Sequence, residues 1–141
     1  MAFIHGKAGF FSIDDATPTV RDISVYISNV DFTREADNPE TTTFTKNDRT
    51  FIAGLIGSNF SISGFWDPTV TTGPDEVLNG ILGSAVSSTF VYGPEGNTAG
   101  DITYTGECFE SSYNISGSVD GVVEFTADFT ITDAITRITA V

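Results

Sequence analysis

The chain has 141 residues, of which 40% are hydrophobic and 18% are charged, so it holds enough apolar material for the core of one domain spanning residues 1–141. Six Lys and Arg stand against nineteen Asp and Glu, which gives a formal net charge of -13. This excess of negative charge argues against a protein that binds nucleic-acid phosphates. No apolar run approaches the roughly 20 residues that a membrane-spanning helix needs.

The charged residues are unevenly distributed. Eleven acidic residues and no Lys or Arg lie between Arg49 and Arg137. One interpretation is an ordinary solvated acidic surface, and another is a surface that repels a polyanion. The single cysteine, Cys108, has no disulfide partner within the chain, and the N-terminal residues lack the pattern of a secretory signal, so we expect folding in a reducing cytoplasm.

Two strands are predicted in the N-terminal part of the chain. Residues 8–13 are rich in aromatic and β-branched side chains, which favour a strand. Further along, Val30 and Phe32 alternate with Asp31 and Thr33. This period of two predicts a strand with one buried and one solvated face.

A long loop is expected over residues 35–58. It contains Pro39 and has weak periodicity, and connections of this length are uncommon in a compact domain unless they have a function. Three of the six basic residues, Arg34, Lys46 and Arg49, lie in this region. A basic loop on an acidic body suits a contact with another copy of the chain, and the alternative is a mobile surface loop without a partner.

A strand and then a helix are predicted next. Over residues 60–66, Phe60, Ile62, Gly64 and Trp66 alternate with Ser61, Ser63 and Phe65, which is typical of a half-buried strand. A helix is predicted over residues 74–83, because Pro74 suits the first helical position, two acidic residues follow it, and Gly83 suits a left-handed stop. A helix this short needs to lay its apolar stripe on a sheet.

The C-terminal part is predicted to consist of strands. Residues 87–92 and 101–106 are expected to flank a hairpin loop. A strand is predicted over residues 122–132, in which apolar and polar side chains alternate strictly from Val123 to Thr132. We expect it to pair with residues 111–118 through a type I′ turn at residues 120–121. Six or more strands with one helix predict a mainly β fold, either a β-sandwich or a partly open barrel with one flanking α-helix.

The sequence gives little support for an enzyme, a metal site or a cofactor. His5 is the only histidine and Cys108 the only cysteine, too few for a histidine-based triad or a zinc site. Neither glycine-rich phosphate-binding pattern opens a helix. Acidic pairs are present but lack calcium-loop spacing. Four aromatic residues could form a sugar-stacking platform, although core positions are the more common use of such strand residues: Trp66, Tyr92, Tyr104 and Tyr113.

The stretch from Asp22 to Asp67 resembles the N-terminal half of the major tail proteins of long-tailed bacteriophages. The pieces that carry the resemblance are Asp22-Ile23-Ser24, Ala36-Asp37, Thr42-Thr43-Phe44, the aromatic-x-x-Gly-Leu run at residues 51–55, the strand at residues 61–64 and Trp66-Asp67, followed by the helix PDEVLNGIL. The resemblance covers residues 20–85 and depends on the order of these pieces. Many relatives have Gly after Thr-Thr-Phe, where this chain has Thr45.

This resemblance implies a structural protein of the virion tail, with no catalysis and no cofactor. Copies would form hexameric rings whose strands join into a continuous inner barrel, and the rings would stack into the tail tube, assembled in the host cytoplasm. Expected partners are other copies, the tape-measure protein, the tail terminator and distal tail proteins, and DNA only in passage. Candidate lumen residues are the acidic ones on alternating strands: Asp31, Glu35, Glu124 and Asp128. Candidate contacts between rings are Arg34, Phe44, Lys46 and Arg49.

Two other functions remain open on the sequence. One is a capsid decoration protein or another virion protein of β-sandwich type, which would form trimers or monomers. The other is a carbohydrate-binding module of a host-recognition structure, which would use Trp66 and the tyrosines.

Overall fold

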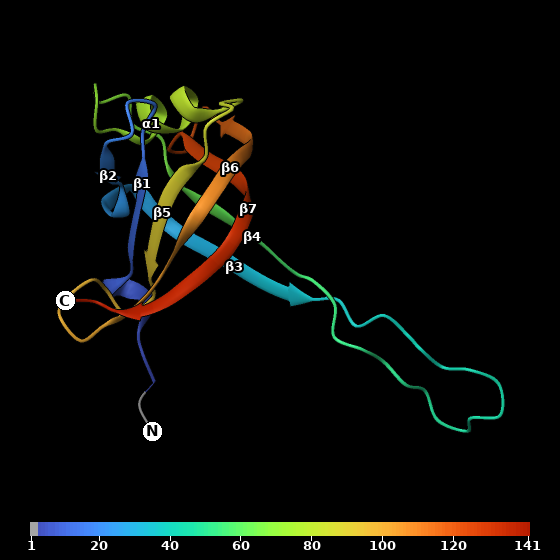
Figure 1. Ribbon diagram of the computed structural model, residues 1–141. Helices are drawn as coiled ribbons and strands as arrows, with labels where there is room; N and C mark the ends of the chain where they lie inside the picture. The colour runs from blue at the N-terminus through green and yellow to red at the C-terminus, as the bar shows by residue number, and fades with distance from the viewer. Residues whose placement is uncertain (1–2) are drawn as a thin grey trace.

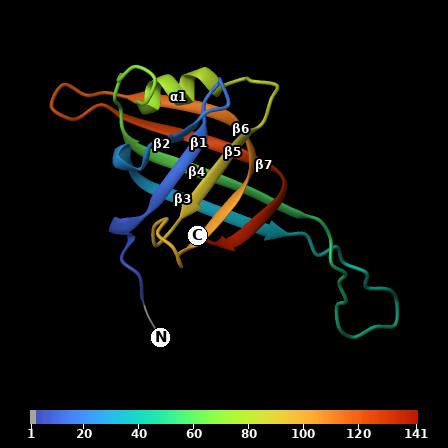
Figure 2. The ribbon, with the colours of Figure 1, turned by 60° about the vertical axis from the view of Figure 1, so that its left-hand side comes forward.

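The computed structural model describes residues 3–141; Met1 and Ala2, which belong to the expected domain, lie outside the described residues. Seven strands form one antiparallel sheet in the order β2-β1-β5-β6-β7-β4-β3 (Figures 1 and 2). The strands are β1 (Phe10–Asp14), β2 (Val20–Asp22), β3 (Ile27–Ala36), β4 (Ile56–Phe65), β5 (Ser88–Gly93), β6 (Ile102–Ser116) and β7 (Glu124–Thr139). The helical elements are α1 (Pro74–Ile81) and two 3-10 turns, η1 (Gly6–Ala8) and η2 (Ser24–Tyr26).

The sheet curls around a core of aromatic residues and forms a partly open barrel. Phe60 lies at its centre, with its ring centroid 4.6 Å from that of Phe129 and 4.7 Å from that of Phe90. Phe11, on β1, lies 5.6 Å from Phe60 and brings the N-terminal strands onto the same core. All four side chains are buried, and each contributes about 1.5–3 kcal/mol relative to exposure. The architecture is therefore one continuous sheet, the barrel form of the predicted fold.

One long strand replaces two predicted ones. The segments expected at residues 101–106 and 111–118 are both parts of the 15-residue strand β6. Register shifts between Thr105 and Glu107 and between Glu110 and Ser112 break the alternation of side chains, which is why the sequence reads as two strands. β6 pairs with β7 along its length but with β5 only from Tyr104 to Cys108.

The turn between β6 and β7 differs from the expected type I′ turn. Residues 117–123 connect the strands, and neither Asp120 nor Gly121 has a positive φ, which a type I′ turn requires. The amide of Gly121 instead donates to the carbonyl of Ser118, at 3.4 Å. The hairpin itself forms as predicted. We call residues 117–123 the hairpin tip.

Helix α1 covers one end of the barrel (Figure 2). Its apolar stripe, Val77, Leu78 and Ile81, is buried, and the chain leaves the helix through Gly83 at φ +78°, where a left-handed residue ends a helix without strain. Tyr113 of β6 donates a hydrogen bond to Asp75 of the helix, at 2.9 Å. Within residues 3–141 no helix has the length and apolar character to cross a membrane.

The expected loop at residues 35–58 is shorter and more regular than predicted. Strands β3 and β4 extend to Ala36 and from Ile56, and residues 37–55 continue them as a narrow ribbon that projects from the barrel (Figure 1). Backbone hydrogen bonds join its two legs, among them Thr41 N to Thr50 O at 2.7 Å, and Glu40 bridges to Phe51. We call residues 37–55 the arm.

Asp15 fixes the turn between β1 and β2. Its carboxylate accepts hydrogen bonds from Thr17, Thr19 and the Nε of Arg21, the last at 2.8 Å. Burial alone would raise the pKa of Asp15, but these hydrogen bonds outweigh it and hold the pKa below the usual 3.8. The stabilisation is therefore present above the unfolded-state pKa and is lost as the pH falls toward the folded-state pKa.

We expect Asp15→Ala to lower the free energy of unfolding by about 1–2 kcal/mol at pH 7, because the turn loses its acceptor. The loss should shrink at pH 3, because Asp15 of the unfolded wild type is then largely protonated and folding must release that proton. Urea unfolding at the two pH values measures it, with the exposed arm residue Asp48→Ala as the control. Equal losses at both pH values would contradict this account.

Candidate assembly surfaces and a buried carboxyl

The outer face of the four neighbouring strands β6, β7, β4 and β3 is polar. Successive residues of these strands point alternately toward the core and away from it. Phe60 and Ile62 face the core, and so do their cross-strand partners Phe129 and Ala127. The alternate positions face outward: Asn29, Asp31, Thr33, Glu35, Gly57, Asn59, Ser61, Ser63, Phe65, Glu107, Phe109, Ser112, Asn114, Ser116, Glu124, Thr126, Asp128, Thr130 and Thr132. None of these is Lys or Arg. We call this set the outer polar face.

All four predicted lumen residues lie on the outer polar face. Asp31 and Asp128 share one row across the strands, with Ser61 between them. Glu35 lies nearer the arm and Glu124 nearer the hairpin tip. Asp128 accepts a hydrogen bond from Ser112 Oγ at 3.0 Å, and this row therefore combines carboxylates with hydroxyls. The structure thus places on one face residues that the sequence assigned to two strands and a loop.

Two edges of this four-stranded unit have free backbone groups. β3 pairs only with β4, and within residues 3–141 no strand pairs with its other edge. On β6, residues 109–116 pair with β7 on one side, while β5 ends its pairing at Cys108. An exposed strand edge is a template for a strand of another chain. Both edges border the outer polar face.

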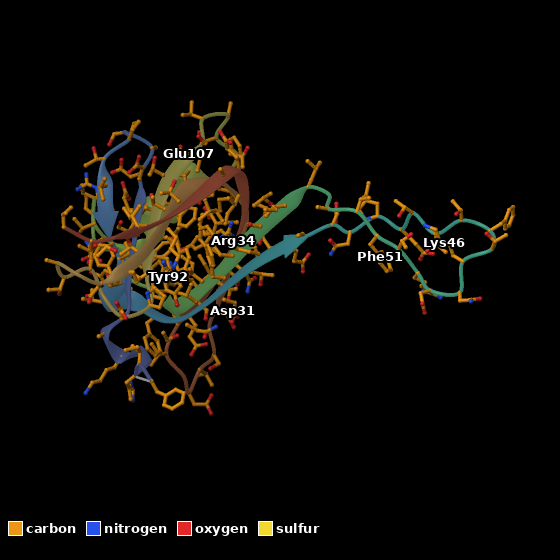
Figure 3. All side chains as sticks on the ribbon, turned by 60° about the horizontal axis from the view of Figure 1, so that its bottom comes forward. Asp31, Arg34, Lys46, Phe51, Tyr92 and Glu107 are labelled. Atoms are coloured by element: carbon orange, nitrogen blue, oxygen red, sulfur yellow. The ribbon has the colours of Figure 1, made fainter. Side chains whose placement is uncertain are left out.

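The predicted inter-ring residues separate into two places. Phe44, Lys46 and Arg49 lie in the arm, whereas Arg34 is on β3 (Figure 3). Placing Arg34 and Glu35 in a loop was therefore wrong, because β3 continues past the apolar positions on which the prediction rested. Arg34 lines a hollow beside the core face of β3, together with Arg137, Tyr92 and Tyr104.

The arm has a more balanced charge and a more apolar surface than a basic loop. Residues 37–55 include two basic and three acidic residues. Arg49 Nη1 lies 4.0 Å from Glu40 Oε1. Phe44 at the end of the arm is 97% exposed, and Leu55 near its base is 83% exposed. Phe51 and Ile52 are also exposed. Exposed apolar groups on an ordered ribbon mark an interaction surface.

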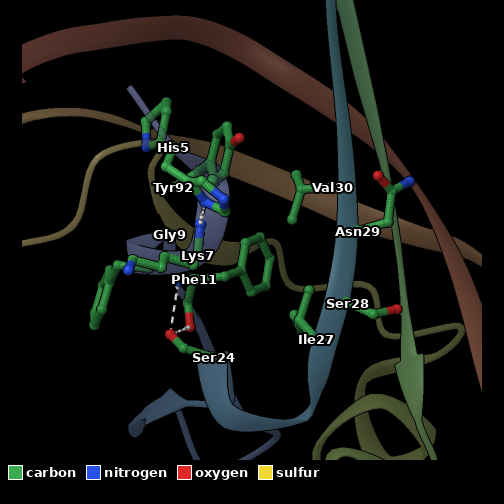
Figure 4. A pocket seen from close by; sticks show the side chains of 13 residues that line it. His5, Lys7, Gly9, Phe11, Ser24, Ile27, Ser28, Asn29, Val30 and Tyr92 are labelled. Carbon is green, nitrogen blue, oxygen red and sulfur yellow. Dashed lines mark hydrogen bonds between the residues drawn. The ribbon is translucent and has the colours of Figure 1, made fainter. Parts of the chain in front are cut away.

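A second surface lies where the barrel is open, between the N-terminal segment and the start of β3. A hollow of about 460 Å³ is found there (Figure 4). Ile27 and Val30 point from β3 toward Phe11 and Tyr92 across this hollow, and its only charged or titratable lining residues besides Tyr92 are His5 and Lys7. We call this hollow the seam groove.

The aromatic residues do not assemble into a sugar-stacking platform. Tyr92 and Tyr104 pack against Phe32, at centroid distances of 5.9 and 5.4 Å, whereas Tyr113 packs against Phe125 at 6.3 Å. In the part of the chain that the structure describes, no three His, Cys, Asp or Glu residues are grouped so that they could hold a metal ion. Cys108 is fully buried, and burial raises the pKa of its thiol.

Glu110 is a buried carboxyl in the barrel interior that the sequence analysis did not single out. It pairs across the sheet with Phe129 and is 7% exposed. Both carboxyl oxygens are buried without a hydrogen-bond partner among the described residues. Burial raises the pKa of Glu110 from 4.5 to about 8, so the group is largely protonated at neutral pH. The two register shifts of β6, which the sequence does not reveal, place it on the core side.

The fold is that of known tail and tube proteins. The chain is similar to one from the tail of an empty GTA particle determined with C6 symmetry, with a TM-score of 0.80, 15% identity, and coverage of 97% of this chain and 100% of that chain. It is similar to the SPP1 tail tube protein at a TM-score of 0.78 and 12% identity, covering 99% and 81%. The sheath-tube complex of the extracellular contractile injection system PVC contains a chain similar at a TM-score of 0.71 and 14% identity, covering 98% and 93%.

No protein-family model and no curated protein matches the sequence. The similarity to the tail and tube chains therefore resides in the fold, which extends over nearly the whole chain.

We expect Glu110→Gln to flatten the dependence of stability on pH. In the wild type the folded state keeps a proton that the unfolded state loses above pH 4.5, so the free energy of unfolding contributed by Glu110 falls as the pH rises from 4.5 toward 8. The variant has no such group to titrate. Chemical unfolding at pH 5, 6.5 and 8 measures the two curves.

The matched control is Glu124→Gln, which changes an exposed carboxylate of the adjoining strand and should follow the wild-type curve. Parallel curves for wild type and Glu110→Gln across this pH range would show that Glu110 ionises in the folded protein much as it does in water.

Proposed function

We propose that this protein is the subunit of a tail tube, forming hexameric rings that stack into the hollow conduit of a virion tail. The observation that carries the proposal is the four-stranded unit β6-β7-β4-β3, which combines an outer polar face with two free edges. The fold shared with the SPP1 tail tube protein and the C6-symmetric GTA tail supports it. The protein acts as a structural component and not as an enzyme.

The even number of strands in the unit suits closure into a ring. Neighbouring strands in the unit are antiparallel, so β3 and β6 run in opposite directions. Rotation about an axis along the strands keeps each direction, so β3 of one copy meets β6 of the next copy as an antiparallel neighbour. Every free backbone group on these two edges then acquires a partner, and the sheet continues without interruption.

The size of the resulting barrel suits a conduit. Six copies with four strands each, spaced about 4.8 Å apart, give a circumference of roughly 115 Å and a backbone diameter of about 37 Å, which strand tilt widens further. The outer polar face would line the bore with the carboxylates of Asp31, Glu35, Glu124 and Asp128. A cation-free acidic wall repels phosphates, so DNA passes through without binding.

The arm supplies the contact between rings. It continues the direction of β3 and β4, so in a ring it projects along the axis, and the seven residues of each leg that precede or follow the turn reach roughly 23 Å when extended. Phe44, Lys46 and Arg49 would contact the next ring, with Phe44 as the apolar anchor. Arg34 would act nearer the ring that carries it, because it lies on β3.

Further partners follow from a tube of limited length. A tape-measure protein would fill the bore during assembly, and a tail terminator and distal tail proteins would close the two ends. Assembly would take place in the host cytoplasm, and the finished protein would reside in the virion tail.

Phe44→Ser should separate ring formation from stacking. Phe44 is 97% exposed, so the variant should fold with unchanged stability and still form rings, but lose the long tubes. Negative-stain microscopy of concentrated protein measures this. Val70→Ser removes another exposed apolar side chain, 77% exposed, and should leave tubes intact. Wild-type protein that stays monomeric, even with the other tail proteins of its virion, would argue against the tube itself.

Glu124→Lys should turn the bore from repulsive to attractive for DNA. Each ring would gain six lysines on the bore wall, so we expect tubes of the variant to retain short duplex DNA at low salt and release it as the salt concentration rises. Fluorescence anisotropy of labelled DNA mixed with tubes measures retention. Glu76→Lys makes the same charge change on the exposed side of α1 and should retain none. Equal retention by the two variants would place Glu124 outside the bore.

A further inference from the structure

The hairpin tip presents apolar side chains and one charge to solvent. Val119 is fully exposed and Val122 is 66% exposed, and Asp120 between them is the only charged residue of residues 117–123. The tip extends past α1 on the side of the barrel opposite the arm (Figure 2). The side chains of Val119 and Val122 do not pack into the core of their own chain, which indicates a contact with another surface.

The seam groove has complementary properties. Its lining includes the apolar side chains of Phe11, Ile27 and Val30, and its charged or titratable lining residues besides Tyr92 are His5 and Lys7. No Asp or Glu lines it, although the chain carries nineteen of them. Among residues 3–141 Lys7 forms no ion pair. A hollow that combines apolar side chains with an unpaired cation suits a small apolar segment that carries one carboxylate.

The direction of the strands brings these two surfaces to the same level of a ring. β3 begins at Ile27, beside the seam groove, and β6 ends at Ser116, directly before the hairpin tip. When β3 meets β6 of the next copy as an antiparallel neighbour, the start of β3 lies beside the end of that β6. The tip of the neighbouring copy then lies beside Ile27, at the end of the seam groove that is nearest the start of β3.

We propose that the hairpin tip of one copy docks in the seam groove of the adjacent copy in the same ring. Val119 and Val122 pack in the seam groove beside Ile27, and Asp120 pairs with Lys7. This contact rests on the proposed ring and adds a side-chain lock to the backbone pairing of β3 with β6. Because donor and acceptor are different surfaces of one chain, the contact is head-to-tail and repeats around the ring.

Cysteine cross-linking tests the contact. Gly6 lines the groove, and a side chain there meets no atom within 4 Å, so Gly6→Cys combined with Val119→Cys places two accessible thiols on the two surfaces. Treatment of assembled rings with a short bismaleimide should give a ladder of covalent oligomers up to six copies in a denaturing gel. The buried thiol of Cys108 should not react, so wild-type rings should stay monomeric in the gel.

The control pair is Gly6→Cys with Thr130→Cys, which moves the second thiol to the middle of the outer polar face and should give no ladder. If wild-type protein forms rings by microscopy but the first pair yields only monomers, the docking is wrong and the ring stands. If wild-type protein forms no rings under any condition, the ring and the docking fail together.

Exchange of the charges gives a second, independent readout. Lys7→Asp alone and Asp120→Lys alone should each shift protein from the ring peak to the monomer peak in size-exclusion chromatography. The double variant should restore the ring peak, because the pair is re-formed with reversed signs. Additive losses in the double variant would overturn the pairing of Asp120 with Lys7.

Discussion

The main physical constraint on this chain is the row of backbone N–H and C=O groups without strand partners along two edges of the sheet that residues 3–141 form. β3 offers its whole outer edge and β6 offers residues 109–116, so an isolated copy leaves a row of peptide groups that only water can satisfy. Such edges normally lead to aggregation, and proteins cover, shorten or charge them. Here the two edges run antiparallel and border one polar face. In the proposed ring, β3 of one copy pairs with β6 of the next, so that the edges that would favour aggregation become the contacts between copies.

The aromatic core holds the strands with free edges in place against the rest of the barrel. Phe60 of β4 stacks on Phe129 of β7 and on Phe90 of β5, so strands from both sides of the barrel share one aromatic centre. The long strands β6 and β7 belong both to the barrel and to the four-stranded unit β6-β7-β4-β3, so no domain boundary separates the two. Glu110 lies on β6, and its carboxyl oxygens are buried without a hydrogen-bond partner among residues 3–141. It lowers the free energy of unfolding as the pH rises, and the apolar packing around it must offset this loss.

The sequence predicted most of the strands and the helix because their periodicity is local. Val30 and Phe32 on β3, the alternating face of β7 and the capped helix at Pro74 depend only on neighbours in the chain. It failed where long-range pairing decides the outcome. The pairing of β6 with β7 continues through two register shifts, so that two predicted strands form one strand and Glu110 turns inward. The arm is ordered by hydrogen bonds between its legs, and the seam groove joins residues far apart in the sequence, so no local pattern reveals either.

A cryo-electron microscopy reconstruction of the assembled protein would show directly which strand edges pair. We expect β3 of each copy to be hydrogen-bonded antiparallel to residues 109–116 of its neighbour, with Glu124 and Asp128 facing a central bore. A reconstruction in which β3 stays unpaired, or in which α1 or the seam groove faces the bore, would contradict this expectation.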